Sequence, residues 1–580
     1  MKLVIDFFKK NKGLSVATIV ALLFQILGTL GVPLLIAKLI DEGIASGDST
    51  LVYQIGLQMV GVAFFAAISA IIGSYLSAQI AASFGYHIRN LFFRKVQKLS
   101  LKDTEEFGVA SLFNRTSNDV DNIQQVMILF LQMILPGPII SVVAIYMTYS
   151  LSPKLTIVPL LSMLVFFIAV FILMKKGNHY SRSVQIKMDQ VTRVFREFFM
   201  GIRVIRAFGN QEYEKKRTDQ TFKEYADNTI KLNQVFAWLT PTVLFLMGAS
   251  LAGILWIGGN EVALGKHQIG SITAVGEYTI ITLAYLVMAA MVIVTIPKGM
   301  ASVYRIQELL TKEPEVKDFA NVNADNQKSQ KEVVAFKNVT FSYQNAAEPV
   351  LQNISFTAKR GEVTAIVGGT GSGKSTIAKA LLRFSEITSG EIQLNGQAIH
   401  ELSQYDLRKK ISYVPQKAYL FSGTIEENLK TGNQTMSSDE LEHIIKIAQS
   451  DSFIHSLEKG IQSQVSQGGS NFSGGQKQRL AIARALAKQA DAYIFDDSFS
   501  ALDFKTDSRL RQALKEELKN KAVIIVAQRI STIKDADQIL VLDEGVMVGK
   551  GTHAELLATN PIYQEFVASQ SASKETQDDE

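Results

Sequence analysis

Long apolar runs alternate with charged segments in the first half of the chain, whereas the second half alternates short apolar and polar runs. A helix that crosses a bilayer needs about 20 consecutive, mostly apolar residues. This length predicts six spans, at residues 14–37, 51–86, 123–152, 155–174, 232–260 and 278–297. A buried soluble helix is the alternative for any one of these runs, but six in succession argue against it.

The positive charges predict the orientation of the spans, because Lys and Arg gather in cytoplasmic loops. They cluster before the first span and after the second, fourth and sixth, at Lys9, Lys10, Lys12, Arg89, Arg94, Lys95, Lys98, Lys175, Lys176, Arg182, Lys298 and Arg305. The opposite loops carry few cations. We therefore expect a multi-pass protein of the cytoplasmic membrane with both termini in the cytoplasm.

The predicted cytoplasmic connections, residues 89–122 and 175–231, are long. Segments such as SLFNRTSNDVDNIQQ place apolar residues at helical spacing between charges. The membrane helices are therefore expected to continue well into the cytoplasm.

The pattern of apolar and polar residues changes after residue 310. Residues 311–331 are polar, without aliphatic periodicity, and predict a linker. From 332 to 568, short strands such as VTAIVGG, DAYIFDD and AVIIVAQR alternate with helical patterns, which predicts an α/β domain with a largely parallel sheet. Residues 569–580 are expected to form a disordered tail.

Composition narrows the function further. The chain has 580 residues, 47% of them hydrophobic and only 19% charged, which favours a membrane protein over an ordinary soluble enzyme. A net charge of +5 is mild and indicates no nucleic-acid partner. Without cysteine, disulfides and thiolate chemistry are excluded, and the seven scattered histidines predict no metal cluster.

A phosphate-binding loop is the clearest chemical motif. GGTGSGKST follows an apolar strand and precedes a helical pattern, which is the context this spacing requires. The loop comprises Gly368, Gly369, Thr370, Gly371, Ser372, Gly373, Lys374, Ser375 and Thr376. Backbone N–H groups and the helix N-terminus would surround the phosphates. Lys374 is expected to reach the β- and γ-phosphates, and the Ser375 hydroxyl to bind Mg²⁺.

A buried strand ending in two carboxylates, IFDD, completes the nucleotide site. Asp496 stands where an acid holds magnesium through water. The two motifs together predict a site for ATP or GTP and do not choose between the bases.

A third motif indicates which of the two nucleotides binds. SNFSGGQKQRLAIARALA resembles the signature sequence of ATP-binding-cassette (ABC) proteins, matching at Phe472, Ser473, Gly474, Gly475 and Gln476, with Phe in the commonly Leu position. The resemblance implies ATP as the nucleotide and Mg²⁺ as the ion. It also implies that the signature of one subunit closes over the γ-phosphate bound by the other.

Further matches extend the resemblance over residues 14–568. Tyr343 resembles the aromatic residue that stacks on adenine, Gln416 the glutamine that contacts magnesium and senses the membrane domain, and Asp503 the loop that crosses the dimer interface. The six-span half resembles that of bacterial multidrug-type exporters. Its coupling regions would lie near Asn118–Asp121 and from Arg196 onward.

Three positions depart from the family pattern. Asp497 replaces the glutamate that polarises the attacking water, and its side chain is shorter by one C–C bond, about 1.5 Å. A misplacement near 1 Å can cost on the order of 100-fold in rate. Gln528 replaces a histidine at the γ-phosphate and cannot become a cation. Gln467 replaces a glutamate that contacts the coupling helices.

The intact signature beside a weakened nucleotide site resembles the degenerate-site half of heterodimeric exporters, and the resemblance implies that this chain's own site binds ATP and hydrolyses it poorly. The partners would be a second half-transporter, membrane lipid and a hydrophobic or amphipathic small molecule. A slow homodimeric exporter and an ATP-binding regulator that transports nothing remain as alternatives.

The substrate is not predicted by these residues. Candidates that could line a cavity, or face lipid, are Phe24, Phe130, Trp238, Phe245, Trp256, Gln25, Gln58, Gln132 and Glu277. The family exports drugs, lipids, peptides and porphyrins, and none of these classes is favoured.

Overall fold

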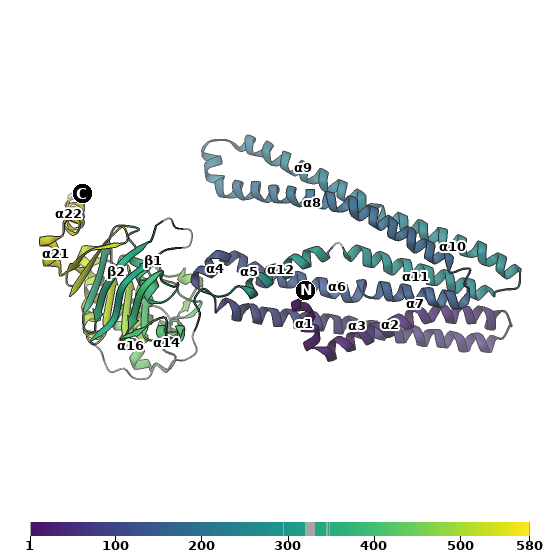
Figure 1. Ribbon diagram of the computed structural model, residues 1–580, viewed down its shortest axis with the longest axis horizontal. Helices are drawn as coiled ribbons and strands as arrows, with labels where there is room; N and C mark the ends of the chain where they lie inside the picture. Colours follow the sequence, from purple (N-terminus) through teal and green to yellow (C-terminus); the bar gives the residue numbers. More distant parts are fainter. Residues whose placement is uncertain (1, 294, 319–330, 344–345, 347, 579–580) are drawn as a thin grey trace. The chain divides into compact units, whose positions relative to one another are not determined.

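The computed structural model describes residues 2–293, 295–318, 331–343, 346 and 348–578. They form two compact units (Figure 1). Unit 1 comprises Met1–Gln97 and Val109–Lys312 and is helical; unit 2 comprises Lys98–Gly108 and Glu313–Glu580 and contains the sheet. This confirms the predicted order of a helical membrane domain followed by an α/β domain.

Unit 1 is built from long helices, several of which are interrupted by short π-helical turns. In order they are α1 (Lys2–Lys10), α2 (Lys12–Lys38), α3 (Ser49–Val96), α5 (Val109–Asn114), α6 (Val120–Leu129), α7 (Pro136–Leu151), α8 (Ile157–Ala207), α9 (Gln211–Ala237), α10 (Leu239–Ala263), α11 (Ile269–Ile293) and α12 (Ile296–Thr311).

Within the described ranges, six continuous helical stretches are long and apolar enough to cross a membrane. They are Lys12–Ile44, Ser49–Val96, Val109–Leu151, Ile157–Ala207, Gln211–Ala263 and Ile269–Ile293. At 1.5 Å per residue, the 51 residues of α8 are about 75 Å long, more than twice the roughly 30 Å hydrocarbon core. The helices therefore do extend well beyond the bilayer, as the amphipathic connections predicted.

The sixth helix starts earlier than the hydropathy pattern indicated. The prediction placed the span at 278–297, whereas α11 begins at Ile269 and ends at Ile293. Its first turn is fixed by a long-range contact, in which the Gly270 N–H donates to Asp41 Oδ1 at 2.6 Å. Glu277, expected at the outer edge of the span, consequently lies two turns inside the helix and is half-buried.

Polar contacts join α8 and α9, which run side by side in Figure 1. Lys187 Nζ lies 2.7 Å from Glu224 Oε2, and Ser183 Oγ donates to Asn228 Oδ1 at 2.8 Å. The two helices meet at an exposed turn containing Phe208. This turn lies in the second predicted coupling region.

Within the described part of unit 2, one sheet has ten strands in the order β5-β4-β1-β2-β12-β11-β3-β10-β9-β6. Their bounds are β1 Glu332–Phe341, β2 Leu351–Lys359, β3 Val363–Gly368, β4 Ser389–Leu394, β5 Gln397–Ala398, β6 Ile411–Val414, β9 Ala492–Asp496, β10 Ala522–Val526, β11 Gln538–Asp543 and β12 Val546–Gly551. Strands β11, β3, β10, β9 and β6 are parallel to one another, and β1 pairs antiparallel with β2 and β4.

The parallel part of the sheet is buried on both faces. In β9, Tyr493 and Phe495 belong to one hydrophobic core and Ile494 to the other. Alternate residues of a strand point to opposite faces, so a strand covered on both sides is apolar throughout. This explains the continuous apolar run in DAYIFDD.

Helices cover the sheet and carry the motifs. They are α13 (Lys374–Leu381), α14 (Gln404–Lys409), α15 (Ile425–Lys430), α16 (Ser438–Ile447), α17 (Asp451–His455), α18 (Gly474–Ala487), α19 (Phe504–Glu517), α20 (Ile530–Ile533), α21 (His553–Thr559) and α22 (Pro561–Asp578). The backbone of α22 continues to Asp578, whereas the sequence pattern predicted an ordered chain only to residue 568.

The start of the predicted linker is bound to α4 (Leu101–Phe107), from the first cytoplasmic connection. Lys102 Nζ lies 3.0 Å from Glu315 Oε1, and the Glu315 N–H donates to Asp103 Oδ2 at 3.1 Å. These contacts explain why residues 98–108 group with unit 2, whereas the predicted domain boundary assigned all of 1–310 to the membrane domain. Residues 319–330 of the predicted linker lie outside the described residues.

An ion pair between the buried Asp119 carboxylate and the partly exposed Arg305 connects α12 to the turn before α6. The Asp119 side chain is 1% exposed and accepts hydrogen bonds from Arg305 Nε and Ser302 Oγ, each at 2.8 Å. Arg305 also donates to the other carboxylate oxygen through Nη2. Asp119 was assigned to the first coupling region, but its side chain serves packing inside unit 1.

We therefore expect Asp119→Ala to destabilise unit 1 by about 1–3 kcal/mol, because buried Ser302 and partly exposed Arg305 lose a charged acceptor. Thermal unfolding of the full-length protein in detergent would measure this loss. The matched control is Asp121→Ala, since Asp121 pairs with Arg89 at 2.6 Å but its side chain is 65% exposed. An exposed pair contributes about 0–1 kcal/mol. Equal losses in the two variants would contradict the structural role of Asp119.

Candidate functional site

The predicted nucleotide residues follow neighbouring parallel strands. The phosphate loop follows β3, Gln528 follows β10, Asp496 and Asp497 end β9, and Gln416 follows β6. The carboxyl ends of parallel strands meet at one edge of the sheet, which is where α/β proteins bind ligands. Residues 150 positions apart in the chain are thereby gathered in one place.

The phosphate loop has a backbone that only glycine adopts easily. Gly371 and Gly373 have φ values of +87° and +93°. At Gly373 an added Cβ would lie 2.7 Å from the side chain of Leu351 and 2.9 Å from the Val350 carbonyl oxygen. Glycine is therefore required at these positions, and the loop leads directly into the N-terminus of α13.

Lys374 is folded onto its own loop. Its Nζ donates to the carbonyl oxygens of Gly368 at 3.0 Å and Gly369 at 2.6 Å. The residue is 8% exposed, and burial lowers the pKa of Lys374, while the charges of Asp497 and Asp496 oppose this shift. A buried ammonium held beside the loop is suited to a phosphate oxygen, which would replace these carbonyl contacts.

Asp496 and Ser375 form an oxygen-rich pair. The Ser375 hydroxyl donates to Asp496 Oδ1 at 2.7 Å, and Asp496 is 2% exposed. Hard cations such as Mg²⁺ prefer hydroxyl and carboxylate oxygens with water and phosphate completing the shell, so these residues fit the ion. Among the described residues no group of three or more His, Cys, Asp or Glu forms a separate metal cluster.

Tyr413 is a member of the site that the sequence analysis missed. Its hydroxyl donates to Asp496 Oδ2 at 3.1 Å. Burial and the neighbouring Asp496 charge raise the pKa of Tyr413, so the phenol keeps its proton and remains a donor. Its position three residues before Gln416 in YVPQ was the available signal, but only the pairing of β6 with β9 shows the contact.

Asp497 is held in place by both its backbone and its side chain. Its φ is +46°, in the left-handed region that Asp and Asn tolerate better than most residues. Its N–H donates to the Val526 carbonyl at 2.8 Å, and its Oδ2 accepts from Gln416 Nε2 at 3.2 Å. Burial and the Asp496 charge raise the pKa of Asp497, and the Gln416 hydrogen bond opposes the rise.

Tyr343 stands after β1, close to the strands that touch the loop. Its ring is 42% exposed and packs edge-on against Phe341 with centroids 4.9 Å apart. Phe341 pairs with Leu351, and Leu351 is the residue that faces Gly373. An exposed aromatic face is therefore connected to the phosphate loop through two packed residues.

The signature residues form a second group. Ser473 caps α18: its N–H donates to Gln476 Oε1 at 2.9 Å, and its Oγ accepts from the Gln476 N–H at 3.3 Å. An added Cβ on Gly475 would lie 3.2 Å from the Ala501 carbonyl, whereas one on Gly474 would meet nothing within 4 Å. Asp503 caps α19 by accepting from the Thr506 N–H at 2.9 Å. Hence the signature abuts the 500–503 loop.

Phe472 and Gln467 are two further predicted positions, and one is buried whereas the other is exposed. Phe472 is 8% exposed and packs edge-on against Phe453 at 6.3 Å, so it is a core residue. Gln467 is exposed in a short 3₁₀ turn.

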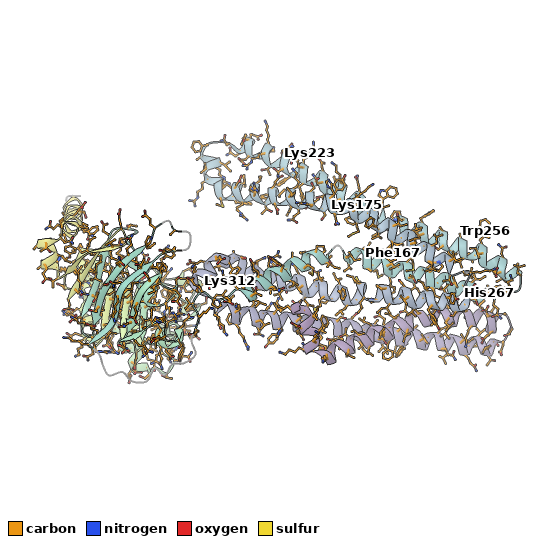
Figure 2. All side chains as sticks on the ribbon, in the orientation of Figure 1. Phe167, Lys175, Lys223, Trp256, His267 and Lys312 are labelled. Carbon is orange, nitrogen blue, oxygen red and sulfur yellow. The ribbon has the colours of Figure 1, made fainter. Side chains whose placement is uncertain are left out.

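The aromatic candidates of unit 1 are exposed in this chain. Phe24, Phe130, Trp238, Phe245 and Trp256 are 44–78% exposed, and Trp256 projects outward from α10 in Figure 2. Of the glutamines, Gln58 is exposed, Gln25 is half-buried, and Gln132 Nε2 donates to the Ser74 carbonyl at 3.5 Å.

An apolar cavity of about 270 Å³ lies among α8, α9, α10 and α11 of unit 1. Its lining contains Val170, Leu173, Met174, Phe236, Leu239, Ala290 and Met291. The sequence analysis named none of these residues, because apolar residues within spans carry no signal that separates a lining position from a packed one.

Comparison with known proteins agrees with this architecture. Residues 15–287 match the family model of the ABC transporter transmembrane region, and residues 351–500 match that of the ABC transporter. An uncharacterised ABC transporter ATP-binding protein of Mycobacterium tuberculosis (strain CDC 1551 / Oshkosh) is 35% identical over 95% of this chain and 95% of its own.

Two further similarities concern exporters. The ATP-dependent lipid A-core flippase of Vibrio vulnificus (strain YJ016) is 30% identical, covering 96% of this chain and 95% of its own. The solved structure of a bacterial Atm1-family ABC exporter with ATP bound has a TM-score of 0.81 at 26% identity, covering 96% and 98% of the two chains.

The contact between Tyr413 and Asp496 generates a prediction. Residues that hydrogen-bond a metal-binding group typically contribute about 10-fold or more to metal affinity. Tyr413→Phe should therefore raise the Mg²⁺ concentration needed for half-maximal ATP binding by about 10-fold. Tyr405→Phe is the control, since Tyr405 is 74% exposed in α14. An unchanged Mg²⁺ requirement in Tyr413→Phe would show that this hydroxyl has no part in the site.

Proposed function

The chain belongs to the ABC transporter family, whose exporters are multi-pass proteins of the cytoplasmic membrane with a cytoplasmic ATPase domain, and on that premise we propose that it is the weakly hydrolysing half of a heterodimeric exporter. Its own phosphate loop binds Mg-ATP and hydrolyses it slowly. Its signature completes a second, faster site on a different polypeptide.

The observation that carries this proposal is the fixed position of Asp497. A carboxylate about 1.5 Å shorter than glutamate could still reach the attacking water if its backbone moved. The Asp497 N–H is bonded to Val526 of β10, and Asp496 before it belongs to β9. The backbone shift would break the sheet at its edge, so the shorter reach is not compensated.

The protonation of Asp497 does not offset this shorter reach. A general base accepts a proton best when its pKa is near the operating pH and the carboxylate is free. Asp497 instead accepts a hydrogen bond from Gln416, although burial raises its pKa. The raised pKa alone would favour a base, but a base must also touch the water, and geometry therefore decides against hydrolysis.

Gln528 is the second residue that weakens hydrolysis at this site. It follows β10, is exposed, and stands where the family places a histidine at the γ-phosphate. A glutamine amide donates a neutral hydrogen bond, which is weaker than one from a charged imidazolium. ATP would still bind through Lys374 and Ser375, but the transition state would lose a positive charge.

The signature is suited to contact a ligand that another chain holds. Gly474 opens into free space, so nothing within the described chain requires glycine there. Glycine is used where backbone must approach a ligand closely. The N–H groups of the first turn of α18 and the Ser473 hydroxyl would then hold the γ-phosphate of ATP bound by the partner.

In the proposed cycle, ATP at both sites joins the two nucleotide domains, and hydrolysis at the partner's site separates them. Bound Mg²⁺ would supply charge neutralisation at the phosphate oxygens. In this chain, Ser375 and Asp496 would hold the ion, Lys374 would bind the phosphates, and Tyr343 would stack on the adenine. Asp503 orders the loop that faces the partner.

The coupling to the membrane domain would use two surfaces. One is α4, bound to Glu315 at the start of the linker. The other is the exposed Phe208 turn between α8 and α9. Gln467 is neutral where the family has a glutamate, so one charged contact of this coupling is absent. The structure gives no reason for that substitution.

The proposed substrate is a hydrophobic or amphipathic compound. The support is the apolar cavity among α8–α11, together with a relative named as a lipid A-core flippase. Within this class the name of the relative favours a lipid, and the apolar cavity agrees with any hydrophobic compound.

Two alternatives make different predictions. A slow homodimeric exporter would transport without any second gene product. A regulatory subunit would bind ATP and move no substrate in vesicles, whether its nucleotide site is intact or mutated.

The direct test is turnover of the full-length chain, purified alone and co-purified with a half-transporter encoded beside its gene. The proposal requires slow turnover alone and rapid turnover in the complex. Rapid turnover by this chain alone would overturn it.

The asymmetry predicts unequal mutants in the assembled transporter. Ser473→Ala should lower the ATPase rate by about 10- to 100-fold, because the serine serves the competent site. Lys374→Ala should abolish nucleotide binding at this chain and lower the rate less. Ser437→Ala is the control for lost helix capping, since Ser437 caps α16 with the same hydrogen-bond pattern. Equal losses for Ser473→Ala and Lys374→Ala would count against the asymmetry.

A gain of function should also be possible. Asp497→Glu restores the missing methylene, and Gln528→His restores the cationic donor. The double variant should raise hydrolysis at this chain's own site by about 10- to 100-fold. Asp497→Asn should remain slow while still binding ATP. A double variant that binds ATP yet stays at the wild-type rate would contradict the account of Asp497.

A further inference from the structure

The C-terminal helix α22 is hydrogen-bonded to the loop that carries Gln528. Gln570 uses both ends of its side-chain amide: Nε2 donates to the Gln528 carbonyl at 2.7 Å, and Oε1 accepts from the Ile530 N–H at 2.8 Å. The backbone on either side of Arg529 is therefore fixed by one side chain that lies 40 residues further along the chain.

The Ile530 contact satisfies a specific need of the loop. Ile530 is the first residue of α20, a helix of only four residues whose N-cap, Arg529, makes no side-chain capping bond. Helix N-termini require acceptors for their free N–H groups. Gln570 supplies one from another helix, where an Asn, Asp or Ser at the N-cap would ordinarily do so.

The helix that carries Gln570 is itself firmly docked. Phe566 and Val567 pack against the main core of unit 2, and Tyr563 is fully buried with its hydroxyl 2.7 Å from His553 Nδ1. Positions 563, 566, 567 and 570 share one face of a helix. Gln570 thus continues the buried face by one turn, and the amide arrives at the loop with little freedom.

The opposite end of the loop is fixed by the sheet. The Ala527 N–H donates to the Ile366 carbonyl at 3.1 Å, in the strand that leads into the phosphate loop. Only the stretch from Gln528 to Arg529 lies between this bond and α20. The Gln570 amide therefore determines the backbone orientation at the residue whose side chain would face the γ-phosphate.

We infer that Gln570 is a positioning residue for nucleotide binding: α22 holds the Gln528 loop in the conformation that contacts the γ-phosphate. This rests on the proposed function, in which Gln528 lies at that phosphate. Because ADP lacks the γ-phosphate, the contribution of Gln570 is specific to ATP. By linkage, displacement of α22 weakens ATP binding, and bound ATP strengthens the docking of α22.

The experiment measures binding of Mg-ATPγS and Mg-ADP to the full-length chain in lipid nanodiscs. Gln570→Ala removes both hydrogen bonds, and Gln570→Glu keeps the acceptor for Ile530 but loses the donor to Gln528. Both variants should weaken ATPγS binding by about 3- to 10-fold, which corresponds to the loss of one or two hydrogen bonds. ADP binding should be unchanged. Gln564→Ala is the control, because the described contacts of the Gln564 side chain, on the same helix, consist of one hydrogen bond to the nearby Leu557 carbonyl at 2.7 Å.

The ratio of the two affinities separates positioning from simple stabilisation. If Gln570 only stabilised the fold, both nucleotides would weaken together and the melting temperature without nucleotide would fall in proportion. Equal weakening of both nucleotides, or wild-type ratios in both Gln570 variants, would overturn the inference. Lys374→Ala is measured in parallel: if it leaves ATPγS binding intact, the proposed nucleotide site itself is wrong, independently of Gln570.

Discussion

The hydrogen bond from the Asp497 N–H to the Val526 carbonyl is the constraint on which the functional account depends. It fixes the backbone beside the nucleotide at the edge of a sheet that is buried on both faces. With the backbone fixed, the reach of a side chain at this position is set by its own length. In the proposed function, the shorter side chain of aspartate is therefore what makes hydrolysis slow at this site.

The same sheet edge explains how the rest of the site is organised. Four parallel strands deliver the phosphate loop, the Asp496–Asp497 pair, Gln416 and the Gln528 loop to one line of carboxyl ends. Hydrogen bonds then connect them: Ser375 and Tyr413 to Asp496, and Gln416 to Asp497. The signature lies against the 500–503 loop, where an added Cβ on Gly475 would be 3.2 Å from the Ala501 carbonyl, and it is open at Gly474. In the proposed function, these two groups of residues belong to two different composite nucleotide sites.

Local patterns in the sequence predicted much of this structure. The phosphate loop, the apolar strand before Asp496 and the six apolar runs are encoded within windows of about 20 residues, where periodicity and motif spacing operate. The start of α11 was missed because a long-range contact supports it: the Gly270 N–H donates to Asp41, 229 residues away in the chain. Tyr413, Gln570 and the binding of Glu315 to α4 were missed for the same reason. Each depends on a pairing of distant segments that no local pattern carries.

The central claim is that ATP at this chain's own site stays unhydrolysed while the transporter works. The most direct measurement labels the turning-over complex by photo-crosslinking with 8-azido-ATP carrying ³²P at either the α- or the γ-phosphate. The account predicts that this chain retains both labels, because its nucleotide is still a triphosphate. Retention of the α-label with loss of the γ-label from this chain would show that Asp497 supports hydrolysis, and would contradict the account.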